Sequence, residues 1–73
     1  MMNKFGKKIE ALRTARNLSV KEVASMLSIP QSRLIELERG VRIPESTQVN
    51  RMETFYEVPH GDLAALVYQP TAS

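Results

Sequence analysis

The chain has 73 residues, a net charge of +2 and no cysteine. These values predict a single domain over residues 1–73 and exclude both a disulfide framework and a thiolate zinc site. The charged N-terminal stretch gives no sign of a signal peptide and no segment is long enough to span a membrane, so we expect a cytoplasmic protein.

The positive charge is concentrated in the first part of the chain. Residues 1–42 carry nine of the ten Lys and Arg against four acids, a net of +5. Residues 43–73 carry one Arg against four acids, a net of −3. This split predicts one end that faces a polyanion, although solvated surface charges divided by chance are the alternative.

An apolar stripe at helical spacing identifies the first helix, over residues 4–16. The stripe consists of Phe5, Ile9 and Leu12. Arg13 and Arg16 fall close to the same stripe, so each needs a polar partner inside the fold. Asn17 and Leu18 then end the helix.

The second predicted helix starts at Ser19. Ser19 and Glu22 fit a capping box, in which each side chain accepts from the free backbone N–H of the other residue. The inner face of this helix is formed by Val20, Val23, Ala24 and Leu27. Residues 28–30 make the turn that follows, because Pro30 disfavours helix at the residue before it and suits the start of the next helix.

The third predicted helix covers residues 31–39, and Gly40 is a suitable left-handed stop. Its inward positions are Leu34, Leu37 and Glu38, and its outward positions are Ser32, Glu36 and Arg39. Two helices joined in this way form a helix-turn-helix over residues 19–39. This motif presents one side of its second helix to an outside partner, most often the major groove of DNA.

The rest of the chain predicts two more helices. A loop over residues 41–45 precedes a helix near 46–57, whose inward positions are Val49, Met52 and Tyr56. A second break leads to a short helix over 62–67, and the tail at about 69–73 is expected to be disordered. The predicted fold is therefore all-α, a compact bundle of five short helices.

The inward position of Glu38 is a second clue to the fold. An ionised carboxylate on an apolar face is costly without a partner. Arg13 also lies on an inner stripe, and a guanidinium can meet a carboxylate with two parallel hydrogen bonds. We therefore predict that Arg13 and Glu38 tie the first helix to the third; two separately solvated side chains are the alternative.

These segments resemble those of a known family. The matching stretches are LRTARNLSVKEVASML, SIPQSRLIELERG, RIP and the segment that ends YEVPHGDLAAL. Over residues 5–66 the chain resembles the Cro/C1-type helix-turn-helix family, also called the XRE family. The resemblance implies a lambda-repressor-like DNA-binding domain and a sequence-specific transcriptional regulator, in most cases a repressor. In that family an Arg on the first helix pairs with a Glu before the closing glycine, and Arg13 and Glu38 occupy those places.

The chain also departs from the family pattern. Ser28 stands where the turn often has glycine, and Pro30 stands where the cap of the third helix is often Ser or Thr. Val20 replaces a common Gln that binds phosphate, so that contact is expected to be missing. Ser46 and Glu53 replace apolar residues of the fourth helix, so we expect that helix to pack loosely or Glu53 to reach solvent.

The resemblance implies which residues read bases. The base-reading positions of the family correspond here to Gln31, Ser32, Arg33 and Glu36. Gln31 can make two hydrogen bonds to adenine and Arg33 two to guanine. Glu36 can accept from cytosine N4, or act against other sequences by repelling phosphates.

Other residues are expected to contact phosphates. The best candidates for these contacts are Lys21, Arg39 and Arg42, together with helix N-termini. For any one Lys a merely solvated role is the alternative, since surface charges are common.

Family members usually bind as two-fold dimers, on half-sites about 34 Å apart. The resemblance therefore implies a palindromic operator and a homodimer that is weak or assisted by DNA. Val67 and Tyr68 are the expected dimer surface, whereas Leu63 and Leu66 are as well explained by closing the core.

No enzyme, cofactor or metal site is expected. The single histidine, His60, stands beside a proline and a glycine, and no nucleophilic cysteine or phosphate-binding glycine loop appears. The alternative function is a protein-interaction module, or an antitoxin that binds a partner protein and regulates its own operon. The polar outward side of the third helix favours DNA over such a partner.

Overall fold

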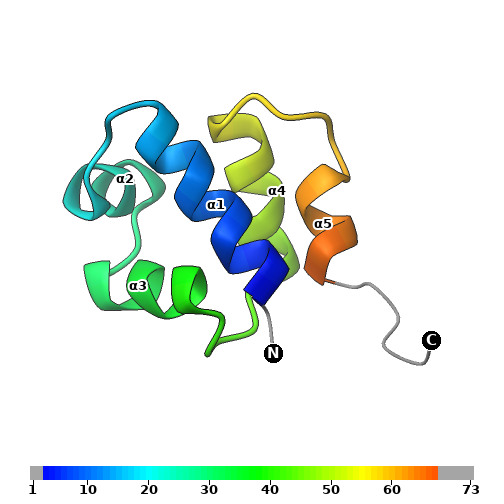
Figure 1. The fold of residues 1–73 in the computed structure, drawn as a ribbon, viewed down its shortest axis with the longest axis horizontal. Coiled ribbons are helices and arrows are strands. Elements are labelled where there is room, and N and C mark those ends of the chain that lie inside the picture. Colours follow the sequence, from blue (N-terminus) through cyan, green and yellow to red (C-terminus); the bar gives the residue numbers. More distant parts are fainter. Residues whose placement is uncertain (1–2, 68–73) are drawn as a thin grey trace.

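The computed structural model describes residues 3–67, which form five helices around one core (Figure 1). The helices are α1 (Asn3–Ala15), α2 (Val20–Leu27), α3 (Gln31–Arg39), α4 (Ser46–Phe55) and α5 (Asp62–Val67). No strand occurs among these residues, which confirms the predicted all-α class. Tyr68 and the predicted disordered tail lie outside the described residues.

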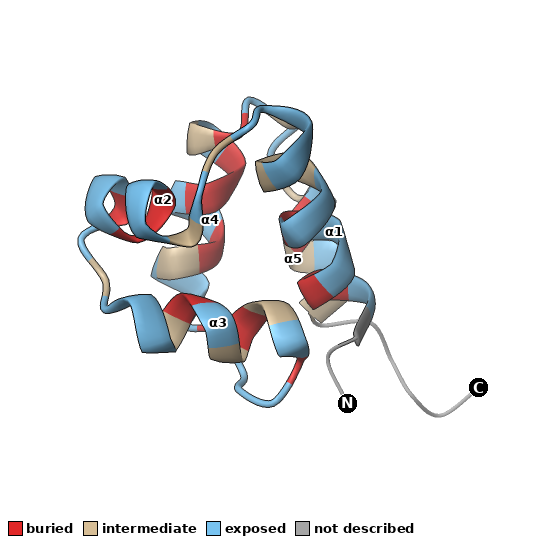
Figure 2. Cartoon of the chain, turned by 60° about the vertical axis from the view of Figure 1, so that its left-hand side comes forward, coloured by how far each residue is buried: buried red, intermediate tan, exposed pale blue. Residues whose placement is uncertain are grey.

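One apolar core holds the helices together. α1 packs on α3 and α5, while α2 packs on α3 and α4 packs on α5. The buried positions of the helices face the interior (Figure 2). The core consists of Phe5, Ile9, Val23, Ala24, Leu27, Leu34, Leu37, Val49, Met52, Tyr56 and Leu63. None of the helices in residues 3–67 has the length and hydrophobicity that a transmembrane segment needs.

Four helices end at a residue in the left-handed conformation. These residues are Asn17, Ser28, Gly40 and Glu57, with φ of 56°, 60°, 78° and 57°. In each case the next N–H donates to a carbonyl five residues back, as Val58 does to Glu53. This arrangement satisfies carbonyls that the helix end would leave free. It also ends α4 at Phe55, two residues earlier than the sequence predicts.

Gly6 lets α1 and α3 approach closely. This glycine lies within α1 and is buried in the protein. A Cβ placed on it would lie 2.3 Å from the carbonyl oxygen of Glu38. The same Cβ would lie 2.8 Å from the carbonyl oxygen of Leu37. Because these atoms belong to the backbone of α3, any side chain at position 6 would force the two helices apart.

The expectation that α4 packs loosely or that Glu53 reaches solvent is wrong. Glu53 is 1% exposed, and its Oε2 accepts from the backbone N–H groups of Gly61, Leu63 and Ala64 at 2.9–3.0 Å. The first turn of a helix has free N–H groups, and Gly61 has no side chain with which to cap them. Glu53 therefore caps α5 from α4 and joins the two helices.

Candidate nucleic-acid interface

Both ends of α2, the first helix of the helix-turn-helix, are capped. At its start the Ser19 hydroxyl accepts from the N–H of Glu22 at 3.0 Å, and the Glu22 carboxylate accepts from the N–H of Ser19 at 2.8 Å. The bond from the Ser19 N–H stabilises the ionised carboxylate and lowers the pKa of Glu22. At its end Ser28 turns the chain, and Pro30 begins α3 with an extended backbone and no side-chain cap. The capping box and the boundaries of α3 agree with the sequence prediction.

Arg13 fixes this motif to α1. Its Nε donates to Glu38 Oε2 at 2.7 Å and its Nη2 donates to Glu38 Oε1 at 3.1 Å. Its Nη1 donates to the carbonyl of Leu18 at 2.9 Å. The two charged side chains are only 13% and 7% exposed, and the bond to Glu38 raises the pKa of Arg13. One guanidinium thus joins α1, the loop before α2 and the inner side of α3.

Arg16, the other arginine near the stripe, braces α1 against the end of α4. Its Nη2 donates to the carbonyl of Tyr56 at 2.5 Å, and its guanidinium carbon lies 5.4 Å from the centre of the Tyr56 ring. Tyr56 is buried, and burial raises the pKa of its hydroxyl to about 12. Arg16 is thereby held against the end of α4.

The side of α3 that points away from the core is open. This outer face of α3 comprises Gln31, Ser32, Arg33, Ile35, Glu36 and Arg39. Gln31, Ser32 and Arg39 are exposed, while Arg33 and Glu36 are about one third and two fifths exposed at their side chains. Ile35 is 37% exposed, on the flank that borders α1. All four residues predicted to read bases therefore lie on one accessible face.

Arg42 returns to this face from the loop after α3. The left-handed conformation of Gly40 reverses the chain, and Arg42 Nε then lies 2.6 Å from Glu36 Oε1. Arg33 Nε lies 4.0 Å from the same oxygen. Residue spacing did not reveal this cluster, because it needs the reversal at Gly40 to bring positions 36 and 42 together.

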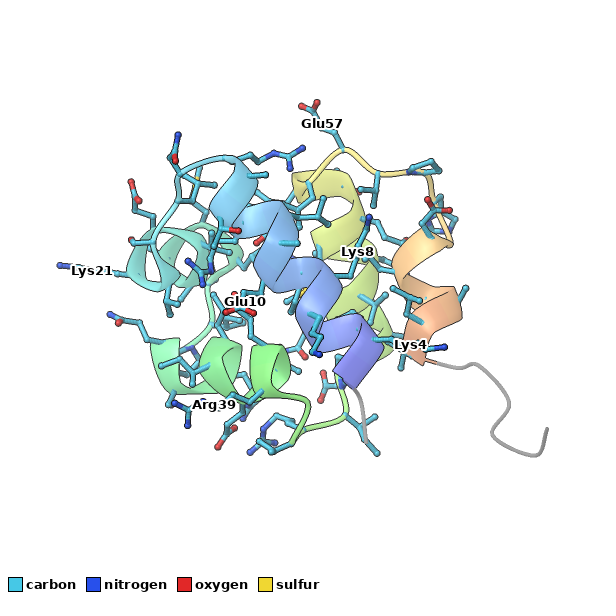
Figure 3. All side chains as sticks on the ribbon, viewed as in Figure 1. Lys4, Lys8, Glu10, Lys21, Arg39 and Glu57 are labelled. Carbon is cyan, nitrogen blue, oxygen red and sulfur yellow. The ribbon has the colours of Figure 1, made fainter. Side chains whose placement is uncertain are left out.

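The other predicted phosphate contacts come from separate elements. Lys21 extends from α2 and Arg39 from α3, and both side chains are exposed (Figure 3). Lys7 lines a groove between α1 and α3 together with Arg39, Glu10 and the side chain of Glu38. The basic side chains predicted to contact phosphates therefore come from α2, α3 and the loop after α3.

Of the two residues of the predicted dimer surface, only Val67 lies within the described part of the chain. Leu63 is fully buried in the core, whereas Leu66 and Val67 on α5 are half-buried. Tyr68 lies outside the described residues. His60, at the start of α5, is exposed and its Nδ1 lies 3.3 Å from Glu53 Oε1. Within residues 3–67 no group of three or more acids and histidines is placed to hold a metal ion.

Comparisons with known proteins agree with this geometry. Residues 9–63 match a protein family described as helix-turn-helix. The chain is 31% identical over 61 residues to the cryptic phage CTXphi transcriptional repressor RstR of Vibrio cholerae. That match covers 84% of this chain and 55% of the relative, so the chain spans about half of the length of the relative. No solved structure shows a significant match.

Proposed function

Because the chain belongs to the Cro/C1-type (XRE) helix-turn-helix family of transcriptional regulators, we propose that it binds double-stranded DNA sequence-specifically and represses transcription. The outer face of α3 is the observation that carries this proposal. It is exposed and mostly polar, and the Arg13–Glu38 pair holds the helix rigidly from behind. A helix of this kind fits the major groove, where base edges offer hydrogen-bond donors and acceptors.

The residues near the start of α3 would contact base edges. Gln31 suits adenine and Arg33 suits guanine, each through two parallel hydrogen bonds. Glu36 can accept from the N4 amine of cytosine, and Ser32 can serve a base or a phosphate. Each role follows from side-chain chemistry and from an accessible position on this face.

Phosphate contacts would frame these base contacts. Lys21, Arg39 and Arg42 extend from three different segments around α3, so together they can fix its angle in the groove. Pro30 gives α3 no side-chain cap, which leaves N–H groups of its first turn available to a phosphate oxygen.

One copy covers only a few base pairs, so two copies on a palindromic site would raise both affinity and specificity. Val67 and the neighbouring Leu66 of α5 are half-buried, so each retains some apolar surface for such a contact. The contact would be small, which fits a dimer that forms on DNA more readily than in solution.

Selection of bound duplexes from a random pool tests the function. We expect a palindrome whose half-sites lie about one helical turn apart, ~34 Å. Arg33→Ala should then cost about 1–3 kcal/mol and remove the preference at one base pair, whereas Arg39→Ala should weaken all sequences alike. Recovery of no common sequence would contradict specific binding. If Arg33→Ala lost as much affinity for random duplexes as for the selected duplex, the base-reading role of Arg33 would be contradicted.

Exposed apolar side chains favour a protein partner as a second candidate. Met26, Val41 and Ile43 are 62%, 69% and 73% exposed. Binding to random duplexes at several salt concentrations separates the two functions, because phosphate contacts give a steep loss of affinity with salt. Absence of binding at low salt would leave a protein-interaction module or an antitoxin as the better proposal.

A further inference from the structure

Glu36 and Arg42 form an ion pair in the middle of the proposed interface. Their charged atoms are 2.6 Å apart, yet their side chains are 41% and 43% exposed. An ion pair in contact with water is weak, because solvent screens the attraction and both side chains lose freedom. A DNA phosphate could therefore replace the carboxylate of Glu36 as the partner of Arg42.

The same carboxylate also faces Arg33. Glu36 Oε1 lies 2.6 Å from Arg42 Nε and 4.0 Å from Arg33 Nε. One of these arginines is a proposed phosphate contact and the other a proposed base contact. Glu36 is thus the acid of the outer face of α3, while Glu38 points inward to Arg13.

We propose that Glu36 contributes to sequence specificity indirectly. Its carboxylate pairs with Arg42 and so opposes contact between Arg42 and phosphates until the correct base donates a hydrogen bond to Glu36. This inference rests on the proposed function. At a matching site a base amine, such as N4 of cytosine, donates to Glu36 and releases Arg42 to the backbone. At other sites Arg42 can reach a phosphate only at the cost of its pair with Glu36, and the free carboxylate repels the nearby phosphates. The phosphate contact then depends on the sequence, although Arg42 itself touches no base.

The test measures binding to a mixed-sequence duplex over a range of salt concentrations. It compares the wild-type protein with Glu36→Gln, Arg42→Gln and the double variant. We expect Glu36→Gln to bind this duplex roughly fivefold more tightly at low salt and to steepen the salt dependence by about 0.9, the value for one extra phosphate contact. Most of the gain in affinity, and the change in salt dependence, should disappear when Arg42 is already Gln, because only the direct repulsion of phosphates by Glu36 is then removed.

Glu57→Gln is the matched control for net charge. It removes the same charge from an exposed acid at the opposite edge of the molecule from α3 (Figure 3). A gain for Glu57→Gln equal to that for Glu36→Gln would overturn the inference. So would a full gain for Glu36→Gln in the Arg42→Gln background.

A second measurement uses the duplex recovered by selection from a random pool. Here Glu36→Gln should lower the ratio of selected-site affinity to mixed-sequence affinity by about tenfold or more. The variant loses the contact of Glu36 with a base, and it no longer holds Arg42 away from phosphates at other sequences. An unchanged ratio would overturn the inference while leaving DNA binding intact. Failure of every protein to bind any duplex at low salt would instead overturn the proposed function itself.

Discussion

α3 carries two glutamates two residues apart, and each accepts a hydrogen bond from an arginine Nε at nearly the same distance. Glu38 meets Arg13 at 2.7 Å and Glu36 meets Arg42 at 2.6 Å. The side chains of the first pair lie between α1 and α3 and are mostly buried, whereas those of the second are about two fifths exposed on the outer face. The surroundings, and not the distance, therefore assign the first pair to the fold and the second to binding.

Mutation of the buried pair is expected to cause the largest loss of stability. Glu38→Gln would leave the charge of Arg13 buried without a counter-ion, and we expect a loss of about 3–5 kcal/mol in the free energy of unfolding. Urea titration would measure the loss. The double variant Arg13→Met/Glu38→Leu should regain a large part of it, because an apolar pair leaves no isolated charge. Full stability of Glu38→Gln would show that the pair is not structural.

Gly6→Ala tests the close approach that brings the buried pair together. Alanine favours a helix over glycine by about 1 kcal/mol, so the variant would be stabilised if there were space for its methyl group. The backbone oxygens of Leu37 and Glu38 occupy that space, and we expect a net loss of about 2–3 kcal/mol. Thermal unfolding decides the sign, and a raised midpoint would contradict the close packing of α1 on α3.

Glu53 is a third carboxylate, buried like Glu38 but paired with backbone N–H groups. Burial raises its pKa, while the N–H groups of Ala64, Gly61 and Leu63 lower it more strongly, so its pKa lies below the ordinary value of 4.5. The stabilisation is therefore present above about pH 4.5 and is lost as the pH falls through the lowered pKa.

Glu53→Gln keeps the acceptor oxygen and removes the charge. We expect a loss of about 1–2 kcal/mol at neutral pH, because bonds to charged acceptors are the stronger ones. Unfolding midpoints measured at several pH values should show a smaller decrease below pH 4.5 in the variant than in the wild type. Identical pH profiles for the two proteins would rule out Glu53 as the group responsible.

The smallest effect on stability belongs to the exposed pair. Glu36→Gln makes the same chemical change on the same helix as Glu38→Gln, and we expect it to cost less than about 0.5 kcal/mol. The two variants can be compared in one urea titration. Equal losses in the free energy of unfolding would contradict the assignment of Glu38 to the fold and of Glu36 to binding.

The residues that sequence reasoning placed correctly are those whose role follows from local spacing. The helices, the capping box of Ser19 and the stop at Gly40 follow from short-range patterns. The partner of Arg13 also followed, because two charges on inner faces each need an opposite charge. The resemblance to a family led to the same pair independently.

The residues that sequence reasoning missed depend on how distant segments meet. Gly6 is informative only once α3 is known to cross α1 at that point. In the sequence, Glu53 is a polar residue at a position that is usually apolar. Its role is visible only in the structure, where the start of α5 lies beside it and the Gly61 N–H donates to its carboxylate. The chain reversal after α3, which sets Arg42 against Glu36, is likewise a property of three dimensions.

The central claim, that the outer face of α3 receives DNA, is tested most directly by mapping backbone amide shifts in an NMR titration with a short duplex at low salt. The account predicts the largest shifts at residues 31–33 and 39–42, with small ones in α4 and α5. Shifts confined to α4 and α5, or no shifts at any duplex concentration, would contradict it.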